Sequence, residues 1–258
     1  MSDIEWLDED VFDGAVERSF RVKRSGRLVP GVLWLPPSGS APAPLVLSGH
    51  GGSGHKRSVR VVEDGRWFAA HAGFAAVAID GPYHGERVRA PLPAGQYQAR
   101  IAEEGIEVVL DRMTDDWRGT VDAVGAVGAA GAVDPGWLAC LGMSMGARFG
   151  LAVAAEMNDR FRCLVLGKFG LRQCNAMHPG MAAPERVARD AARVTASLLF
   201  HVPQDDKVFP RNGQLELFGL IGSPTKHLTL EAGPHANTTP AAIAGWRSFV
   251  AERLTDGR

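Results

Sequence analysis

The residues around Ser144 have the pattern best suited to covalent chemistry in this chain. Gly142-Met143-Ser144-Met145-Gly146 has the form G-x-S-x-G, which builds a nucleophile elbow where a strand runs through a sharp turn into a helix. The serine in such a turn has a strained backbone, and a side chain two residues away on either side would clash with neighbouring chain. The pattern predicts a serine nucleophile if a strand precedes it and a helix follows.

The flanking sequence meets that condition. Residues 137–141 are a short apolar run after the turn residues 134–136, which predicts a buried strand. Residues 147–157 are rich in alanine, which predicts a buried helix. The alternative interpretation of the pattern is an ordinary glycine-bounded turn.

A serine hydroxyl is a poor nucleophile unless a base is within hydrogen-bonding reach and an acid orients that base. Asp205 and Asp206 follow an apolar run at 198–202, and His235 follows another at 227–230. Because catalytic groups gather beyond the carboxyl ends of parallel strands, we expect Ser144, one of the two aspartates and His235 to meet there.

The remaining pattern predicts the scaffold. Residues 16–24 and 28–35 alternate apolar and polar side chains around Ser25-Gly26, which predicts an antiparallel hairpin. Apolar runs then alternate with helical segments, which predicts an α/β fold with a mostly parallel sheet covered by helices on both faces. Further strands are expected at 45–48, 74–79 and 162–167. Helices are expected at 58–72, 117–128 and 213–221, with another that ends over 191–197 and a last one that begins at Pro240.

The expected domain organisation is simple. Residues 1–14 are polar and are expected to form a loosely held leader, with a single domain over 15–258. Residues 88–116 and 168–190 are candidate lid segments, and both are short. Residues 36–44 predict a surface loop.

Several motifs together resemble the α/β-hydrolase superfamily, and within it the branch of dienelactone hydrolases and prolyl-oligopeptidase-like esterases. They span residues 45–240 and are His50-Gly51-Gly52, Asp80-x-x-x-His84-Gly85, Gly142-Met-Ser-Met-Gly146, Asp206-x-x-x-Pro210 and Gly233-x-His235. Dienelactone hydrolases differ from this chain, because they carry a cysteine nucleophile and an arginine shortly after the histidine. The resemblance implies an α/β-hydrolase fold with a minimal lid and hydrolytic chemistry, not a dienelactone substrate.

The resemblance also implies roles. Ser144 would attack an acyl carbonyl, His235 would carry the proton, and Asp206 would orient the imidazole. The register of the motif, an acid followed three residues later by Pro210, selects Asp206 over Asp205. The backbone amides of Met145 and Gly52 would hold the oxyanion.

Other residues near these motifs have weaker assignments. Met143, Phe169, Met177 and Phe209 are candidates for an apolar substrate pocket, with core packing as the alternative. His50 is expected to be a packed loop residue, with a catalytic base as the alternative, and His84 is expected to make a local hydrogen bond under the site. Arg57, Arg60 and Arg87 could contact an anionic substrate, although solvated surface charge is the simpler interpretation.

Composition excludes several classes of function. The chain has 258 residues and a formal net charge of −1, and it has no basic stripe suited to a nucleic acid. It contains no apolar stretch long enough to span a membrane, and its acidic N-terminus is unlike a signal peptide. The three cysteines have no metal-type spacing, and buried free thiols fit a reducing cytoplasm.

We therefore expect a cytoplasmic carboxylic-ester hydrolase that acts on a small or medium acyl group. Its partner would be a small-molecule ester, with no nucleic acid, membrane, metal or organic cofactor involved. A thioesterase, a small amidase or a non-catalytic binding protein with the same fold are the alternatives.

Overall fold

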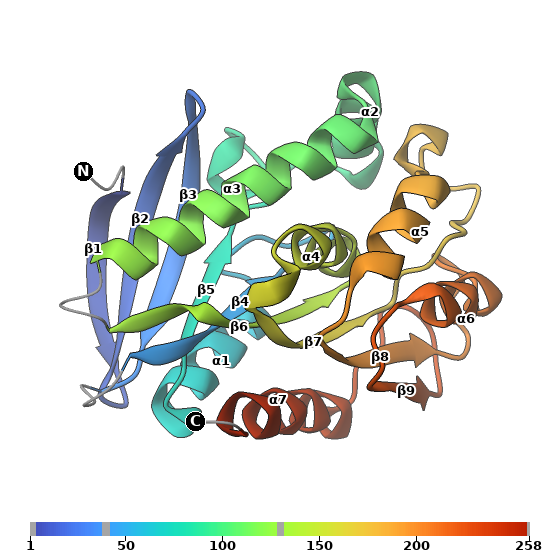
Figure 1. Ribbon diagram of the computed structural model, residues 1–258. Coiled ribbons are helices and arrows are strands. Elements are labelled where there is room, and N and C mark those ends of the chain that lie inside the picture. The colour runs from blue at the N-terminus through green and yellow to red at the C-terminus, as the bar shows by residue number, and fades with distance from the viewer. Residues whose placement is uncertain (1–3, 38–41, 128–131, 257–258) are drawn as a thin grey trace.

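The computed structural model describes residues 4–37, 42–127 and 132–256. Its centre is a sheet with the strand order β1-β2-β3-β5-β4-β6-β7-β8-β9 (Figure 1). The strands are β1 (Ile4–Phe12), β2 (Ala15–Arg24), β3 (Arg27–Leu35), β4 (Ala43–Gly49), β5 (Ala75–Ile79), β6 (Val133–Met143), β7 (Phe161–Gly167), β8 (Ser197–Pro203) and β9 (Lys226–Glu231). The helices are α1 (Val59–Trp67), α2 (Ala94–Glu104), α3 (Ile106–Val127), α4 (Met145–Glu156), α5 (Pro184–Arg193), α6 (Arg211–Leu220) and α7 (Pro240–Thr255).

The sheet combines an antiparallel and a parallel part. β1, β2 and β3 pair antiparallel, and β3 also pairs antiparallel with β5. From β5 to β9 all neighbouring strands are parallel. The predicted α/β architecture, with its N-terminal hairpin and mostly parallel sheet, is confirmed. The carboxyl ends of the parallel strands consequently lie along one edge of the sheet, where the predicted site residues follow β6, β8 and β9.

Helices cover both faces of the sheet, as predicted. In Figure 1, α3, α4 and α5 lie over one face, while α1 and α7 lie over the other. Each layer encloses its own apolar core. The core under α3 and α4 includes Phe20, Ile101, Met113 and Leu166, whereas the core under α1 and α7 includes Trp34, Phe68, Trp246 and Val250. No helix in the described part of the chain is long and apolar enough to cross a bilayer.

The N-terminal segment differs from the sequence prediction. Within the expected leader 1–14, residues 4–12 form β1, the outer strand of the sheet, which pairs with β2 along almost its whole length. Trp6 packs edge-to-face on Phe20, with 5.8 Å between the ring centroids, and the Arg18 guanidinium lies over the Trp6 ring. The strand was not predicted because its sequence is polar, and it is polar because most of its side chains are exposed at the edge of the sheet.

Segment 88–116 is also more regular than predicted. It contains all of α2 and the first half of α3, which begins eleven residues before the expected Trp117. Gly128, the predicted end of that helix, lies outside the described residues, as do 38–41 of the predicted loop. The expected turn at 134–136 lies inside β6, where the Asp134 carboxylate accepts a hydrogen bond from the Gly136 amide. α5 ends at Arg193, four residues before the predicted Ser197.

Candidate active site

Ser144 lies at the tip of the turn between β6 and α4. Its backbone has φ 58° and ψ −116°, a conformation that L-residues rarely adopt, and its amide donates to the carbonyl oxygen of Gly167 at 2.9 Å. Glycine is required at positions 142 and 146 because a side chain there would clash with neighbouring backbone. A Cβ on Gly142 would lie 2.5 Å from the Gly146 carbonyl oxygen, and a Cβ on Gly146 would lie 2.6 Å from that of Gly49. The predicted strand, sharp turn and helix are thus present, with the clash that explains both glycines.

Three side chains from different strand ends form a hydrogen-bonded chain. Ser144 Oγ lies 3.0 Å from His235 Nε2, and His235 Nδ1 lies 2.8 Å from Asp206 Oδ2. With the ring proton on Nδ1, the imidazole donates to the carboxylate and accepts from the serine hydroxyl. This arrangement can remove a proton from the serine.

The two adjacent aspartates point to different partners. Asp206 is buried, and its Oδ1 accepts from the amides of Val208 and Phe209 at 2.8 and 2.9 Å. Asp205 instead pairs with the loop before His235, because its Oδ2 accepts from the Gly233 amide at 3.2 Å. Asp206, not Asp205, therefore lies against the imidazole.

Lys168 holds the loop that carries His235. Its ammonium donates to the carbonyl oxygens of His235, at 2.9 Å, and of Asn237, and to the Thr238 hydroxyl, at 2.6 Å. Lys168 follows β7 with φ 52°, so a strained residue at the end of β7, which β8 separates from β9, supports this loop. Burial lowers the pKa of the Lys168 ammonium to about 8.

The loop after β4 and the first residue of α4 each place a backbone amide at the pocket beside Ser144. Within the described residues, neither the Gly52 amide nor the Met145 amide donates to another backbone group, and both residues line the pocket at Ser144. His84 supports the Gly52 peptide, since its Nε2 lies 2.9 Å from the Gly52 carbonyl oxygen. His50 accepts from the Gly81 amide at 2.8 Å, and burial lowers its pKa to about 4. His84 also bonds locally, with its Nδ1 2.7 Å from the Pro82 carbonyl oxygen, and His50 is buried in its loop, both as expected.

A pocket of about 240 Å³ opens beside Ser144 and His235. Of the predicted pocket residues, Met177 and Phe209 line it. Met143 does not, because its side chain points to the other face of the sheet and belongs to the core under α1 and α7. Phe169 packs edge-to-face behind Phe209, with 5.3 Å between the ring centroids. Neighbours in sequence project to opposite faces of a strand, so adjacency to Ser144 was a poor guide for Met143.

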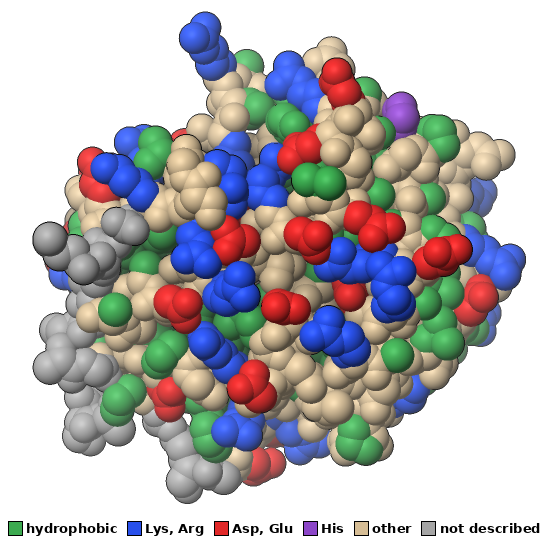
Figure 2. Space-filling model, turned by 45° about the horizontal axis from the view of Figure 1, so that its top comes forward, with side chains coloured by type: hydrophobic (Ala, Val, Ile, Leu, Met, Phe, Trp, Pro, Cys, Tyr) green, Lys and Arg blue, Asp and Glu red, His purple; other side chains and the backbone are tan. Residues whose placement is uncertain are grey.

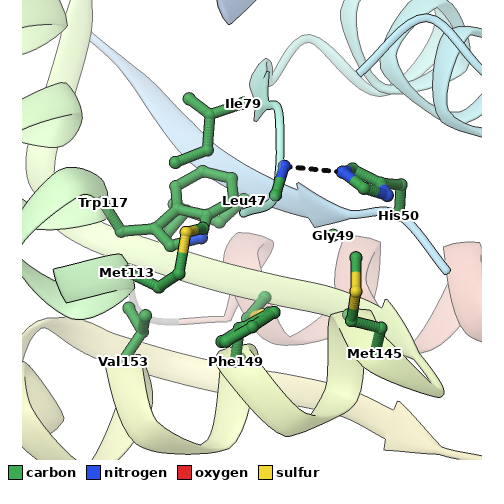
Figure 3. A pocket seen from close by; sticks show the side chains of 13 residues that line it. Leu47, Gly49, His50, Ile79, Met113, Trp117, Met145, Phe149 and Val153 are labelled. Carbon is green, nitrogen blue, oxygen red and sulfur yellow. Dashed lines mark hydrogen bonds between the residues drawn. The ribbon is translucent and has the colours of Figure 1, made fainter. Parts of the chain in front are cut away.

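A second, smaller cavity of about 20 Å³ lies between α3, α4 and the sheet. Figure 3 shows Met113 and Trp117 of α3 facing Phe149 and Val153 of α4 across it, with His50 at the other end. Its walls are almost entirely apolar and it has room for about one water molecule. It is a packing defect behind the nucleophile and not a substrate site.

Several residues at the site were not predicted from the sequence. Tyr97 and Gln98 come from α2, and Arg148 lies one helical turn after Ser144. Gln214 of α6 donates to Asp206 Oδ2 at 2.9 Å. A charged residue inside an alanine-rich buried helix is a signal that could have identified Arg148. In the part of the chain that the structure describes, no three His, Cys, Asp or Glu side chains gather as metal ligands.

Comparison with solved structures identifies the fold. A cold-adapted esterase from an Arctic intertidal metagenomic library matches with a TM-score of 0.80 and 29% identity, over 97% of this chain and 99% of that one. The chain has the α/β-hydrolase fold. No protein-family model matches the sequence, and comparison with curated proteins gives no match.

Two more distant structures share this fold. An acetyl xylan esterase from Paenibacillus sp. R4 matches with a TM-score of 0.72 and 17% identity, over 98% of this chain and 88% of that one. An S-formylglutathione hydrolase from Agrobacterium tumefaciens matches with a TM-score of 0.70 and 17% identity, over 96% and 99%. The likeness extends over almost the whole of each chain, so the sheet and its covering helices correspond together.

Proposed function

We propose that this α/β-hydrolase is a serine esterase that cleaves carboxylic esters of small or medium acyl groups. The observation that carries the proposal is the hydrogen-bonded chain from Ser144 through His235 to Asp206, open to a pocket at the serine. The likeness to the cold-adapted esterase, at 29% identity over nearly the full length, supports the same chemistry.

The proposed reaction has two steps. Ser144 Oγ attacks the ester carbonyl as His235 Nε2 takes its proton, and the amides of Gly52 and Met145 stabilise the oxyanion. The bond to the alkoxy oxygen then breaks, and His235 returns the proton to the departing alcohol. In the second step, water attacks the acyl-serine with the same histidine as base, releasing the carboxylic acid and restoring Ser144. Asp206 stabilises the imidazolium in both steps.

Substitution of the nucleophile tests this proposal. We expect Ser144→Ala to abolish hydrolysis of p-nitrophenyl butyrate and labelling by a fluorophosphonate, with little change in Tm because the side chain lies at a turn tip. Ser248→Ala, an exposed serine on α7, is the matched control and should keep both signals. Residual activity of Ser144→Ala within about tenfold of the parent would contradict the mechanism. A panel of esters, acyl-CoA thioesters and anilides would separate the esterase from a thioesterase or an amidase.

A further inference from the structure

A buried arginine faces the same pocket as the candidate nucleophile. Arg148 lies on α4 one turn beyond Ser144, and its amide donates to the Ser144 carbonyl oxygen at 3.0 Å. Its side chain is 5% exposed and lines the pocket together with Ser144 and His235. The positive charge is therefore fixed on the first turn of the helix that carries the nucleophile.

The guanidinium has no acidic partner. It donates to the Met181 carbonyl oxygen and, at 3.4 Å, to Gln173 Oε1. It also stacks on two rings, with its central carbon 5.2 Å from the centroid of Phe169 and 5.9 Å from that of Phe209. Within residues 4–37, 42–127 and 132–256, no carboxylate lies at ion-pairing distance from Arg148.

Two other arginines have their positive charge balanced by an ion pair with a buried carboxylate. Arg87 pairs with the fully buried Asp116 at 2.8 Å, and Arg57 pairs with the buried Glu17 at 2.6 Å. These contacts occupy two of the arginines that the sequence offered as anion contacts. Arg148 differs from both because its neighbours are neutral oxygens and aromatic rings.

An unpaired charge inside a protein carries a large desolvation cost, which is why buried charges are nearly always paired. Burial lowers the pKa of Arg148 only to about 10, so the side chain is still charged at neutral pH. An anionic group entering the pocket would supply the missing partner. The planar guanidinium matches a carboxylate particularly well, because it can donate two parallel hydrogen bonds.

We propose that Arg148 is a specificity-determining residue that binds an ionised carboxylate on the substrate. This inference rests on the proposed esterase function. The substrate class is then a carboxylic ester with a second, free carboxyl group. That group can belong to the acyl part, as in a half-ester of a dicarboxylic acid, or to the alcohol part, as in an ester of a hydroxy acid.

The test compares esters of matched shape. On the acyl side, monomethyl glutarate is compared with methyl 5-methylhexanoate, in which an isopropyl group replaces the carboxylate. On the alcohol side, the butanoyl ester of glycolate is compared with isobutyl butanoate. The measured quantity is the ratio of kcat/KM for the anionic ester to that for its neutral partner. A variant that loses activity equally on both esters leaves this ratio unchanged, so the ratio reports only on recognition of the carboxylate.

We expect the ratio to exceed one in the parent for one of the two pairs. Arg148→Met should lower that ratio by about 10- to 100-fold, which is the usual contribution of a charge-assisted hydrogen bond. Arg172→Met is the matched control: it removes one positive charge from an exposed arginine paired with Glu216, and should leave the ratio unchanged. An unchanged ratio for Arg148→Met in both pairs would overturn the proposal and leave Arg148 as a support for the Met181 loop.

Two further measurements keep the proposal testable. If Arg148→Met does not fold, glutarate should competitively inhibit hydrolysis of methyl 5-methylhexanoate by the parent, and salt should weaken that inhibition; no inhibition would overturn the proposal. If the parent hydrolyses no ester at all, the proposed function fails. Calorimetric titration of glutarate into Ser144→Ala then tests whether the pocket binds an anion, independently of catalysis. We expect glutarate to bind, and absence of binding would contradict the proposal.

Discussion

The Asp206 carboxylate has its acceptor positions filled by four hydrogen bonds. Two come from backbone amides after β8, one from Gln214, and one from His235. These donors hold the carboxylate in one orientation. The imidazole therefore meets a fixed acceptor, so its Nδ1 carries the proton and its Nε2 is free to accept from Ser144.

This orientation separates the two adjacent aspartates experimentally. We expect Asp206→Asn to lower kcat by about 10²- to 10⁴-fold, because an amide can favour the wrong imidazole tautomer. Asp205→Asn keeps an acceptor for the Gly233 amide, so its kcat should fall by less than about tenfold. Steady-state kinetics on p-nitrophenyl butyrate measure both. The reverse order of losses would assign the acid to Asp205.

Sequence alone could place Ser144, the pair Asp205 and Asp206, and His235 at one edge of the sheet, because each comes shortly after a strand of the parallel sheet. The prediction of Asp206 over Asp205 rested on the family resemblance. The constraint is local, since a turn after a strand fixes which residues reach that edge. Arg148 and Lys168 could not be assigned in the same way. Their roles depend on loops at residues 181 and 235–238, which are remote in sequence.

At the scale of elements, two segments pack over the pocket. α2 contributes Tyr97 and Gln98, and the segment after β7 contributes Met177 and Met181. The side-chain Oε1 of Gln98 accepts from the His178 amide at 2.9 Å, which joins the two segments. They correspond to the candidate lid segments 88–116 and 168–190, and the pocket that they border is small.

A small bordered pocket predicts a preference for short acyl chains. Among p-nitrophenyl esters we expect kcat/KM to peak between acetyl and hexanoyl and to fall by about tenfold at decanoyl. Met177→Ala should move the optimum to longer chains, whereas Met143→Ala, on the other face of the sheet, should not. A rise in rate when the substrate forms micelles would contradict this picture of the two segments.

Ion pairs join the N-terminal hairpin to α3. Asp115 binds Arg24 at 2.7 Å and Arg27 at 3.2 Å, and the hydrogen bond from Arg24 helps to lower its pKa to about 2. A carboxylate with a lowered pKa in the folded state stabilises the protein above its unfolded pKa of about 4, and this contribution is lost as pH falls toward 2.

The pH dependence of stability tests this contact. We expect Asp115→Asn to lower the free energy of unfolding at pH 6, and the difference from the parent to shrink steadily between pH 4 and pH 2. Urea unfolding at several pH values measures it. Asp122→Asn, a half-exposed aspartate of the same helix with one ion pair, is the control and should show a smaller loss at pH 6. A difference that grows with acidity would have the wrong sign.

The elements that sequence predicted least well are β1 and the first half of α3. Neither has a strong pattern of its own. β1 is stabilised by pairing with β2 and by the contact of Trp6 with Phe20, so its strand state depends on a partner. α3 begins directly after Gly105, where φ is 94°, and a break between two helices is hard to distinguish from a loop in sequence.

At the scale of the whole molecule, positive and negative charges nearly balance in number. Figure 2 shows Lys and Arg side chains interspersed with Asp and Glu over the face that it presents, in keeping with a formal net charge of −1. That face carries no large field of one sign. The unpaired charge of Arg148 is therefore a local property of the pocket.

The reactivity of the three cysteine thiols depends on whether the sheet is intact. Cys140 and Cys163 are buried in β6 and β7, and burial raises the pKa of both thiols, that of Cys140 to about 12. Cys174 is partly exposed. We expect Ellman's reagent at pH 8 to modify one thiol rapidly in the native protein and all three in urea. Cys174→Ala should remove the rapid phase, and rapid modification of two or more native thiols would contradict the packing of β6 and β7.

The strand order also has a consequence for synthesis on the ribosome. β4 lies between β5 and β6, and roughly 80 residues separate its end from the start of β6. At translation rates of about 5–20 residues per second, one side of this apolar strand stays unpaired for roughly 4–16 s. A nascent chain in that interval exposes a strand edge open to other chains, so slower translation between β5 and β6 should increase its dependence on chaperones.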